Sequence, residues 1–283
     1  MNKRNIRVAV ISDVHLGTYG CHAKAVNRYL KSINPEILIL NGDIIDIWQF
    51  SKRYWPDSHM KVIQRIFKMM TSGTKVYYLT GNHDEMLRKL TDFRIGKLEL
   101  LDKLVLDLDG KKAWIFHGDV FDVSMKHSKW LAKLGAIGYD TLIVLNSIVN
   151  WASQKMGRGK VSFSKRIKNS VKQAIKFIDD FEETATSIAI ENGYDYVLCG
   201  HIHQPAIRSI KTDKGETLYL NSGDWVENLT ALEYSDKKWS LYHYKDEFGD
   251  EDIYEEDELN VKLPNMESLY QDIITSAITE AKH

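Results

Sequence analysis

Five short apolar segments of this sequence each end in a group of His, Asp and Asn residues. The apolar segments have the length and composition of buried strands. The polar groups that follow them are Asp13-Val14-His15, Gly42-Asp43-Ile44-Ile45-Asp46, Gly81-Asn82-His83-Asp84, His117-Gly118-Asp119 and Gly200-His201-Ile202-His203. In α/β sheets, ligands bind at the carboxyl ends of the strands. The five groups therefore predict one polar site along one edge of a sheet.

The order of the segments predicts an α/β fold. Strands are expected at residues 6–12, 36–41, 75–80, 112–116 and 194–199, and helices at 22–33 and 58–71. This alternation is typical of parallel strands joined by helices. Asp109-Gly110 lies between two apolar segments and predicts a hairpin over residues 104–116. Antiparallel strands are expected later in the chain, at 206–211, 217–221, 229–234 and 238–244.

Each polar group alone has a purely structural interpretation. Asp13 and His15 are compatible with a helix cap, and the Gly-Asn-His-Asp group with a turn. His201 and His203 alternate, so in an extended chain both side chains point to the same side. Five such groups, each closing a strand, favour a metal site over turn chemistry.

The residue types indicate which metals would bind. The candidate ligands are Asp13, His15, Asp43, Asn82, His117, His201 and His203. Imidazole, carboxylate and amide ligands without thiolate suit Mn²⁺, Fe, Co or Zn²⁺ rather than copper(I) or an iron–sulfur cluster. The set is too large for one open catalytic ion but suffices for two that share a carboxylate. Two ions about 3.5–4 Å apart stabilise in-line displacement at phosphorus.

The two cysteines offer no alternative site. Cys21 and Cys199 lie in no Cys-x-x-Cys pair, which argues against a thiolate metal site. Two cysteines cannot form a disulfide framework, so a reducing compartment is expected.

The ordered groups DVH, GDIID, GNHD, HGD and GHIH resemble the calcineurin-like metallophosphoesterases, over residues 6–205. The resemblance implies a four-layer αββα sandwich with a dinuclear metal site at one edge. It assigns Asp13, His15 and His203 to one ion and Asn82, His117 and His201 to the other, with Asp43 as the bridge. Mn²⁺ is the metal expected first, with Fe, Co or Zn as alternatives.

The same resemblance implies a catalytic set of Asn82, His83 and Asp84. His83 would contact a phosphate oxygen or protonate the leaving group, tasks that suit an imidazole near neutral pH. Asn82 would help to hold the transition-state oxygens, and Asp84 would orient His83. Asp46 and Asp119 are expected to support the ligands from behind or to belong to the turns.

The sequence between the fourth and fifth groups predicts an inserted lid. A helical lid is expected at 124–192, within a core formed by 1–123 and 193–245, and an acidic segment with a terminal helix at 246–283. This lid resembles that of the UDP-2,3-diacylglucosamine hydrolases. The resemblance implies that Ser164, Asn169 and Lys172 bind substrate together with Asn82, His83 and His201.

That resemblance also implies a reaction. The pyrophosphate of UDP-2,3-diacylglucosamine would be cleaved to UMP and 2,3-diacylglucosamine 1-phosphate in lipid A biosynthesis. This chain has His83 and Gln204 where those hydrolases usually have Arg. The alternative is therefore a phosphatase or phosphodiesterase acting on another small or lipid phosphoester. A catalytically silent scaffold or a lipid carrier would leave the complete ligand set unexplained.

The charge distribution predicts the partners. The net charge is −1, yet between residues 124 and 176 Asp140 is the one acid among many Lys and Arg residues. Apolar residues recur there at helical spacing, which is typical of contact with an anionic membrane surface. A lipid-linked nucleotide substrate is expected, and nucleic acid is not. The chain has no signal-peptide pattern and no apolar run of about 18 residues. The expected location is the cytoplasm, peripheral on the cytoplasmic face of the inner membrane.

Overall fold

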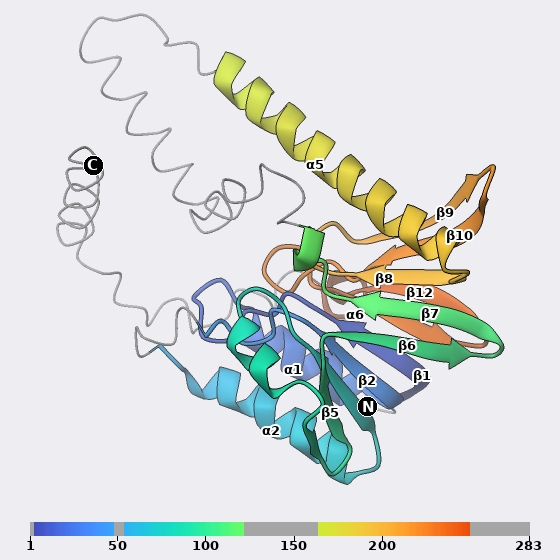
Figure 1. The fold of residues 1–283 in the computed structure, drawn as a ribbon. Coiled ribbons are helices and arrows are strands. Elements are labelled where there is room, and N and C mark those ends of the chain that lie inside the picture. The colour runs from blue at the N-terminus through green and yellow to red at the C-terminus, as the bar shows by residue number, and fades with distance from the viewer. Residues whose placement is uncertain (1–2, 48–53, 122–163, 250–283) are drawn as a thin grey trace, which may run out of the picture. The chain divides into compact units, whose positions relative to one another are not determined.

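Two β-sheets face each other in this computed structural model, which describes residues 3–47, 54–121 and 164–249. The larger sheet has the strand order β12-β11-β1-β2-β3-β5-β4 (Figure 1). Its strands are β1 (Arg4–Ile11), β2 (Ile33–Asn41), β3 (Lys75–Leu79), β4 (Arg94–Ile95), β5 (Leu98–Leu101), β11 (Thr230–Ser235) and β12 (Lys238–His243). The central strands β1, β2, β3 and β5 run parallel.

The smaller sheet has the order β6-β7-β8-β10-β9. Its strands are β6 (Lys103–Leu108), β7 (Lys111–Phe116), β8 (Tyr196–Cys199), β9 (Ala206–Thr212) and β10 (Gly215–Asn221). The hairpin predicted at Asp109-Gly110 is confirmed, since β6 and β7 pair antiparallel. The late strands also pair antiparallel, but the two pairs belong to different sheets. In addition, β10 lies parallel to β8.

Apolar side chains from both sheets form the central core. Val8, Val10 and Leu79 of the larger sheet are buried with Ile115 and Leu198 of the smaller one. Alternate residues of a strand point to opposite faces, so β1 also buries Ala9 and Ile11 on its other face. The sheets are thus held face to face, because each removes the other's apolar surface from water.

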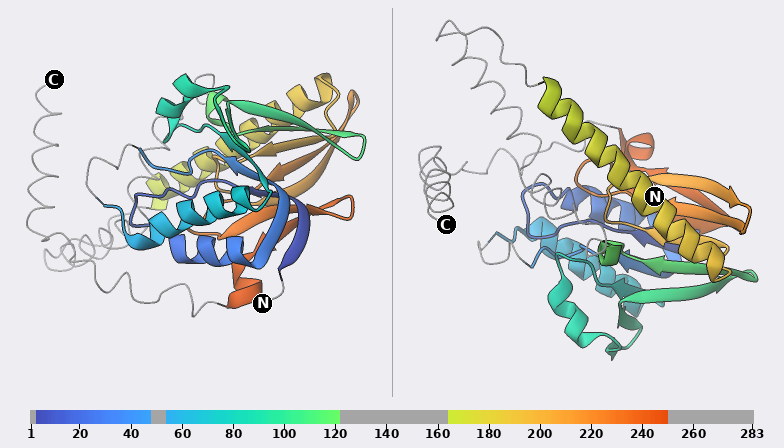
Figure 2. Two further views of the ribbon diagram at one scale, coloured as in Figure 1. Left: turned by 90° about the horizontal axis from the view of Figure 1, so that it is seen from below. Right: turned by 45° about the horizontal axis from the view of Figure 1, so that its top comes forward.

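Helices cover the outer faces of both sheets (Figures 1 and 2). Helices α1 (Ala23–Ser32) and α2 (Asp57–Thr71) lie side by side on the larger sheet. Helix α5 (Ser164–Glu191) buries Phe181, Ala185 and Ala189 against the smaller sheet, at the four-residue spacing of one helix face. The four-layer αββα arrangement is confirmed.

The remaining helical elements are short: η2 (Glu85–Leu90), η3 (Asp119–Phe121) and α6 (Tyr244–Phe248). Tyr244 begins a second unit of the chain, whose described part is α6. Most of the expected lid, 124–163, and the expected terminal helix lie outside the described residues. The lid boundaries expected from the sequence include the part of α5 from Ile175 onward. In the structure this part of the helix belongs to the layer that covers the smaller sheet. None of the described helices combines the length and apolar character that crossing a membrane requires.

Candidate metal centre

The strand ends that carry the expected ligands turn sharply. Asp13, His15, Asp43, His201 and His203 all have left-handed backbone, with φ between 52° and 66°. Residues other than glycine adopt this conformation at an energetic cost, and it persists where surrounding contacts enforce it. Backbone hydrogen bonds join the turns: Asp13 N–H donates to Gly42 O at 3.1 Å and Gly200 N–H to His117 O at 2.9 Å. These two bonds hold neighbouring turns together within each sheet, and the His201 N–H, which donates to Asp13 Oδ2 at 3.1 Å, joins the turns of the two sheets.

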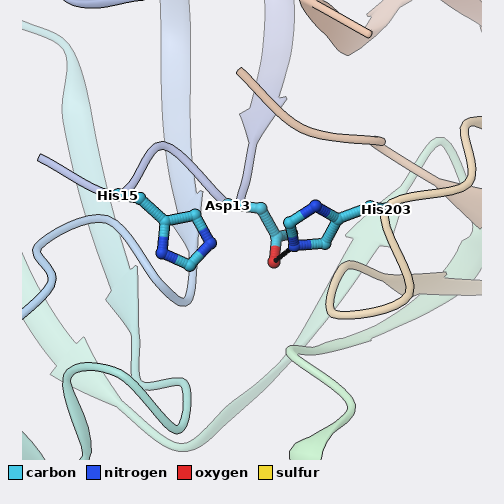
Figure 3. A group of neighbouring side chains, drawn as sticks. All are labelled: Asp13, His15 and His203. Carbon is cyan, nitrogen blue, oxygen red and sulfur yellow. Dashed lines mark ion pairs between the residues drawn. The ribbon is translucent and has the colours of Figure 1, made fainter. Parts of the chain in front are cut away.

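Asp13, His15 and His203 form the first cluster (Figure 3). Their nearest ligand atoms all lie within 4.8 Å of one another. Asp13 is fully buried, and its Oδ1 lies 3.1 Å from His203 Nε2. Two of these residues follow β1 and the third follows β8, so the cluster joins the two sheets.

Asp43 connects two further clusters. One contains His117 and His201, the other His15 and His83. The Oδ2 atom of Asp43 lies 3.2 Å from His117 Nε2, while its Oδ1 accepts the His83 backbone N–H at 2.8 Å. Asp43 thus has the central position that a bridging carboxylate requires.

The orientation of His117 fits a metal ligand. Its Nδ1 lies 2.8 Å from the backbone oxygen of Asn41, a carbonyl that can only accept. Nδ1 therefore carries the proton in the neutral ring, and the lone pair of Nε2 points toward Asp43. Among the described residues, His117 Nε2 and Asp13 Oδ1 are buried, and their ionic contacts with Asp43 at 3.2 Å and His203 at 3.1 Å lack hydrogen-bond geometry. Buried polar atoms normally have a partner, and a divalent cation would provide one for both.

The pKa values reflect the close packing of opposite charges. Burial alone would raise the pKa of Asp13, but His203 and His117 lower it to about 2. Burial alone would lower the pKa of His203, but the Asp13 carboxylate raises it to about 9. The pKa of Asp43 lies well below its usual range for the same reason, because His117 outweighs the effect of burial. In the metal-free protein, protons on histidines balance the carboxylates.

Two glycines make this packing possible. Gly42 precedes Asp43 with φ +79°, and a Cβ there would overlap the ring of His117. Gly81 precedes Asn82, and a Cβ there would overlap Asp43. Because glycine lacks a Cβ, the backbone can approach this closely.

His83 is oriented by Asp46, which corrects the expectation that Asp84 does this. His83 Nδ1 lies 3.0 Å from Asp46 Oδ2. Burial alone would lower the pKa of His83, but Asp46 raises it. Asp84 is fully buried and accepts hydrogen bonds from the Gly81 and Ile44 backbone and from the Tyr78 hydroxyl. It therefore fixes the loops after β2 and β3 to each other.

Replacing Asp46 with Asn is expected to lower kcat roughly 10–100-fold, the usual effect of losing a group that orients a site residue. The loss of the carboxylate lowers the pKa of His83, so the alkaline limb of the pH–rate profile moves to lower pH. Steady-state kinetics across pH on bis-p-nitrophenyl phosphate measure both effects. Asp102→Asn is the matched control, since Asp102 contacts Arg88 and Thr80 instead. A fall in kcat with an unchanged pH profile would mean that Asp46 has only a structural role.

Asp119 and Asp224 lie on two further loops, and of these two Asp224 contacts a candidate ligand. Asp119 Oδ2 lies 2.8 Å from Arg88 Nη2, which ties η3 to η2. Asp224 was missed by sequence reasoning; its Oδ2 lies 3.8 Å from His203 Nδ1. It follows β10 in the run Asn221-Ser222-Gly223-Asp224, the same strand-end signal as the five groups. Ser222 Oγ lies 2.7 Å from Ser12 Oγ, which fixes this loop beside Asp13.

Asn82 is next to His83 in the sequence and is half-buried on the loop after β3. Three other expected substrate-binding residues lie apart from this centre in the sequence. Ser164, Asn169 and Lys172 belong to the first turns of α5. Their side chains lie outside the described part, so their role in binding stays a prediction.

Comparison with known proteins agrees with this geometry. The family model described as calcineurin-like phosphoesterase matches residues 6–205. A protein named UDP-2,3-diacylglucosamine hydrolase from Aliivibrio fischeri (strain MJ11) is 27% identical, covering 83% of this chain and 97% of the relative. One of the same name from Vibrio cholerae (strain El Tor Inaba N16961) is 28% identical, with the same coverage.

Among solved structures, Yfce, a phosphoesterase from E. coli, matches with a TM-score of 0.43 and 15% identity, over 84% of this chain and 93% of that one. The match of the family model carries the assignment, because it spans the strand-end groups from β1 to β8 in order. The chain belongs to the calcineurin-like phosphoesterase family and is a hydrolase of phosphoester bonds.

Proposed function

We propose that this chain is a dinuclear metal-dependent hydrolase that cleaves the pyrophosphate of UDP-2,3-diacylglucosamine to UMP and 2,3-diacylglucosamine 1-phosphate. The observation that carries the dinuclear part is the position of Asp43, which belongs to two clusters of candidate ligands while Asp13 belongs to a third. The substrate is proposed from the names of two relatives, because the match to this chain covers almost the whole length of each of them. Mn²⁺ is the metal we propose, and the cytoplasmic face of the inner membrane is the proposed location.

The proposed ligands divide into the two sets that the family resemblance implies, and the first cluster and the cluster of Asp43, His117 and His201 support this division. Asp13, His15 and His203 would hold one ion, and Asn82, His117 and His201 the other, with Asp43 between them. Bound divalent cations stabilise charge on the phosphoryl oxygens and activate water at neutral pH. The His117 Nδ1–H bond to Asn41 holds that ring with Nε2 directed at the site.

His83 would act on the leaving group. Its Nδ1 faces Asp46, so Nε2 is the atom that can donate a proton to the leaving phosphate oxygen. Asp46 raises the pKa of His83 and so favours the protonated ring. The His83 backbone N–H donates a hydrogen bond to Asp43, which supports a position of His83 beside the proposed bridging carboxylate. Ser164, Asn169 and Lys172 of α5 are proposed to bind the glucosamine end of the substrate.

The experiment is ³¹P NMR of the Mn²⁺-loaded protein with UDP-2,3-diacylglucosamine in ¹⁸O-labelled water. UMP and the lipid monophosphate are the expected products, and the position of ¹⁸O shows which phosphorus is attacked. The Asp43→Asn variant serves as the control for contaminating hydrolases. Turnover of bis-p-nitrophenyl phosphate without turnover of the lipid nucleotide would keep the phosphoesterase and discard this substrate. It would favour the alternative, hydrolysis of another small or lipid phosphoester.

A further inference from the structure

The loop after β1 carries an exposed aromatic side chain that lies against a second aromatic ring. Tyr19 is 59% exposed, and its ring lies 3.9 Å from the ring of Tyr54 between centroids, with 35° between the ring planes. Tyr54 belongs to the segment between β2 and α2, so the pair joins two segments that both follow strands of the metal centre. Because Tyr54 covers one face of the Tyr19 ring, the exposed area of Tyr19 includes its other face.

Tyr19 lies close to the candidate ligands. It follows His15 by four residues, and the chain between them forms a turn in which the Thr18 N–H donates to His15 O at 3.1 Å. The Thr18 hydroxyl donates to the same oxygen at 2.8 Å. A turn of this kind keeps its end Cα atoms within about 7 Å, and the next Cα is about 3.8 Å further on. The Cα of Tyr19 is thus no more than roughly 11 Å from that of His15.

Trp55, the neighbour of Tyr54, borders the loop that orients His83. A Cβ on Gly17 would lie 3.5 Å both from the Asp46 carbonyl oxygen and from the Trp55 ring. The carboxylate of Asp46 lies 3.0 Å from His83 Nδ1. The aromatic residues 54 and 55 therefore lie beside the metal centre rather than elsewhere on the surface.

His59 holds these rings in place. It is buried in the first turn of α2, and its Nδ1 accepts the Gly17 backbone N–H at 2.8 Å. Its ring meets those of Tyr54 and Trp55 edge to face, with centroid distances of 5.7 and 5.6 Å. One buried ring thus links the loop after β1 to the start of α2. A surface that is fixed in advance loses little conformational entropy when a ligand binds.

The chemistry of the tyrosine pair indicates which group would bind there. Nucleobases stack on aromatic side chains, because both have a flat π face. Acyl chains and sugar phosphates have no such face. In the proposed substrate, uracil is the one aromatic group, and a single ribose joins it to the phosphate that the metal centre would bind. The short distance from His15 to Tyr19 suits a ligand of this length.

We propose that Tyr19 and Tyr54 form a stacking platform for the base of the nucleotide half of the substrate. Tyr19 stacks on the base, Tyr54 supports Tyr19 from behind, and His59 is a positioning residue. The assignment rests on the proposed function, which it deepens by naming the residues that recognise the nucleotide. Binding of the nucleotide product needs no lipid, so the platform can be tested without the proposed substrate.

The test is calorimetric titration of the Mn²⁺-loaded full chain with UMP and with ribose 5-phosphate, which lacks the base. UMP is expected to bind roughly 5- to 100-fold more tightly, the usual effect of stacking one base. Tyr19→Ala and Tyr19→Leu are expected to lose most of this difference, while Tyr19→Phe retains it, because phenylalanine keeps the π face. The affinity for ribose 5-phosphate should be the same in all variants, which shows that the metal centre is intact.

The matched control is Phe67→Ala, which removes an aromatic side chain of similar exposure, 50%, from further along α2. It is expected to bind UMP as the unaltered chain does. Equal affinities of the unaltered chain for UMP and ribose 5-phosphate would overturn the platform, as would equal UMP affinities of Tyr19→Ala and the unaltered chain.

The ³¹P NMR experiment on UDP-2,3-diacylglucosamine separates the two proposals. Hydrolysis of the lipid nucleotide by a chain whose UMP affinity does not depend on Tyr19 would keep the proposed function and overturn the platform. UMP binding that depends on Tyr19, without hydrolysis of the lipid nucleotide, would support the platform and discard the lipid substrate.

Discussion

The Asp43→Asn variant is expected to lose hydrolysis by more than about a hundredfold, beyond the effect of removing an outer partner of a metal ligand. Asp43 is 2% exposed and belongs to two of the three ligand clusters. An amide is a neutral and weaker ligand than a carboxylate, and its NH₂ group would face His117 Nε2. The measurement is kcat/KM on bis-p-nitrophenyl phosphate together with the metal content of the purified protein.

The control for this variant is Asp213→Asn, an equal change at an exposed turn. It is expected to have the activity and metal content of the unaltered chain. Thermal unfolding of both variants shows whether Asp43→Asn remains folded. Near-normal activity of a folded Asp43→Asn protein that still holds two ions would contradict the bridging role of Asp43.

Removal of divalent metal is expected to abolish hydrolysis. Stabilisation of phosphoryl charge by bound cations contributes several kcal/mol, which is about a thousandfold or more in rate. Dialysis against a chelator, followed by addition of Mn²⁺, Fe²⁺, Co²⁺ or Zn²⁺ to separate samples, measures the loss and its reversal. Activity should return in proportion to metal, reaching its maximum at two ions per chain. Full activity of metal-depleted protein would refute the metal centre.

Metal uptake should release protons at pH 7. In the metal-free protein the pKa of His203 is about 9, because the Asp13 carboxylate outweighs the effect of burial, and the pKa of His117 is also raised. A histidine must lose its proton to bind metal, so apparent affinity rises with pH until it passes these values. Calorimetric titration in two buffers of different ionisation enthalpy is expected to show about two protons released per chain. Uptake without proton release would place the ions elsewhere.

The candidate ligands could be predicted because their signal is local. A buried strand is a contiguous apolar segment, and its end is visible where Asp13 or His117 interrupts the pattern. The turn at Asp109-Gly110 is equally local, since its conformation depends on two adjacent residues. The αββα layers were expected because the ordered groups resemble those of the calcineurin-like metallophosphoesterases. The apolar faces that the two sheets bury against each other agree with this expectation.

Other features depend on which segments become neighbours. Whether Asp46 or Asp84 contacts His83 is decided by how the loops after β2 and β3 pack, because both carboxylates are close in sequence to a ligand. Asp224 comes beside His203 because β10 pairs with β8, a parallel pairing that the late antiparallel pattern did not predict.

The sequence by itself therefore determined the chemistry of the site, since residue types and strand ends are properties of short stretches of chain. The tertiary structure alone decided the partners of each group. Asp13 accepts the backbone N–H of His201 across 188 positions of sequence, and no periodicity specifies a contact at that separation. Such contacts depend on how the two sheets bury their apolar faces against each other, a cooperative outcome of the whole core.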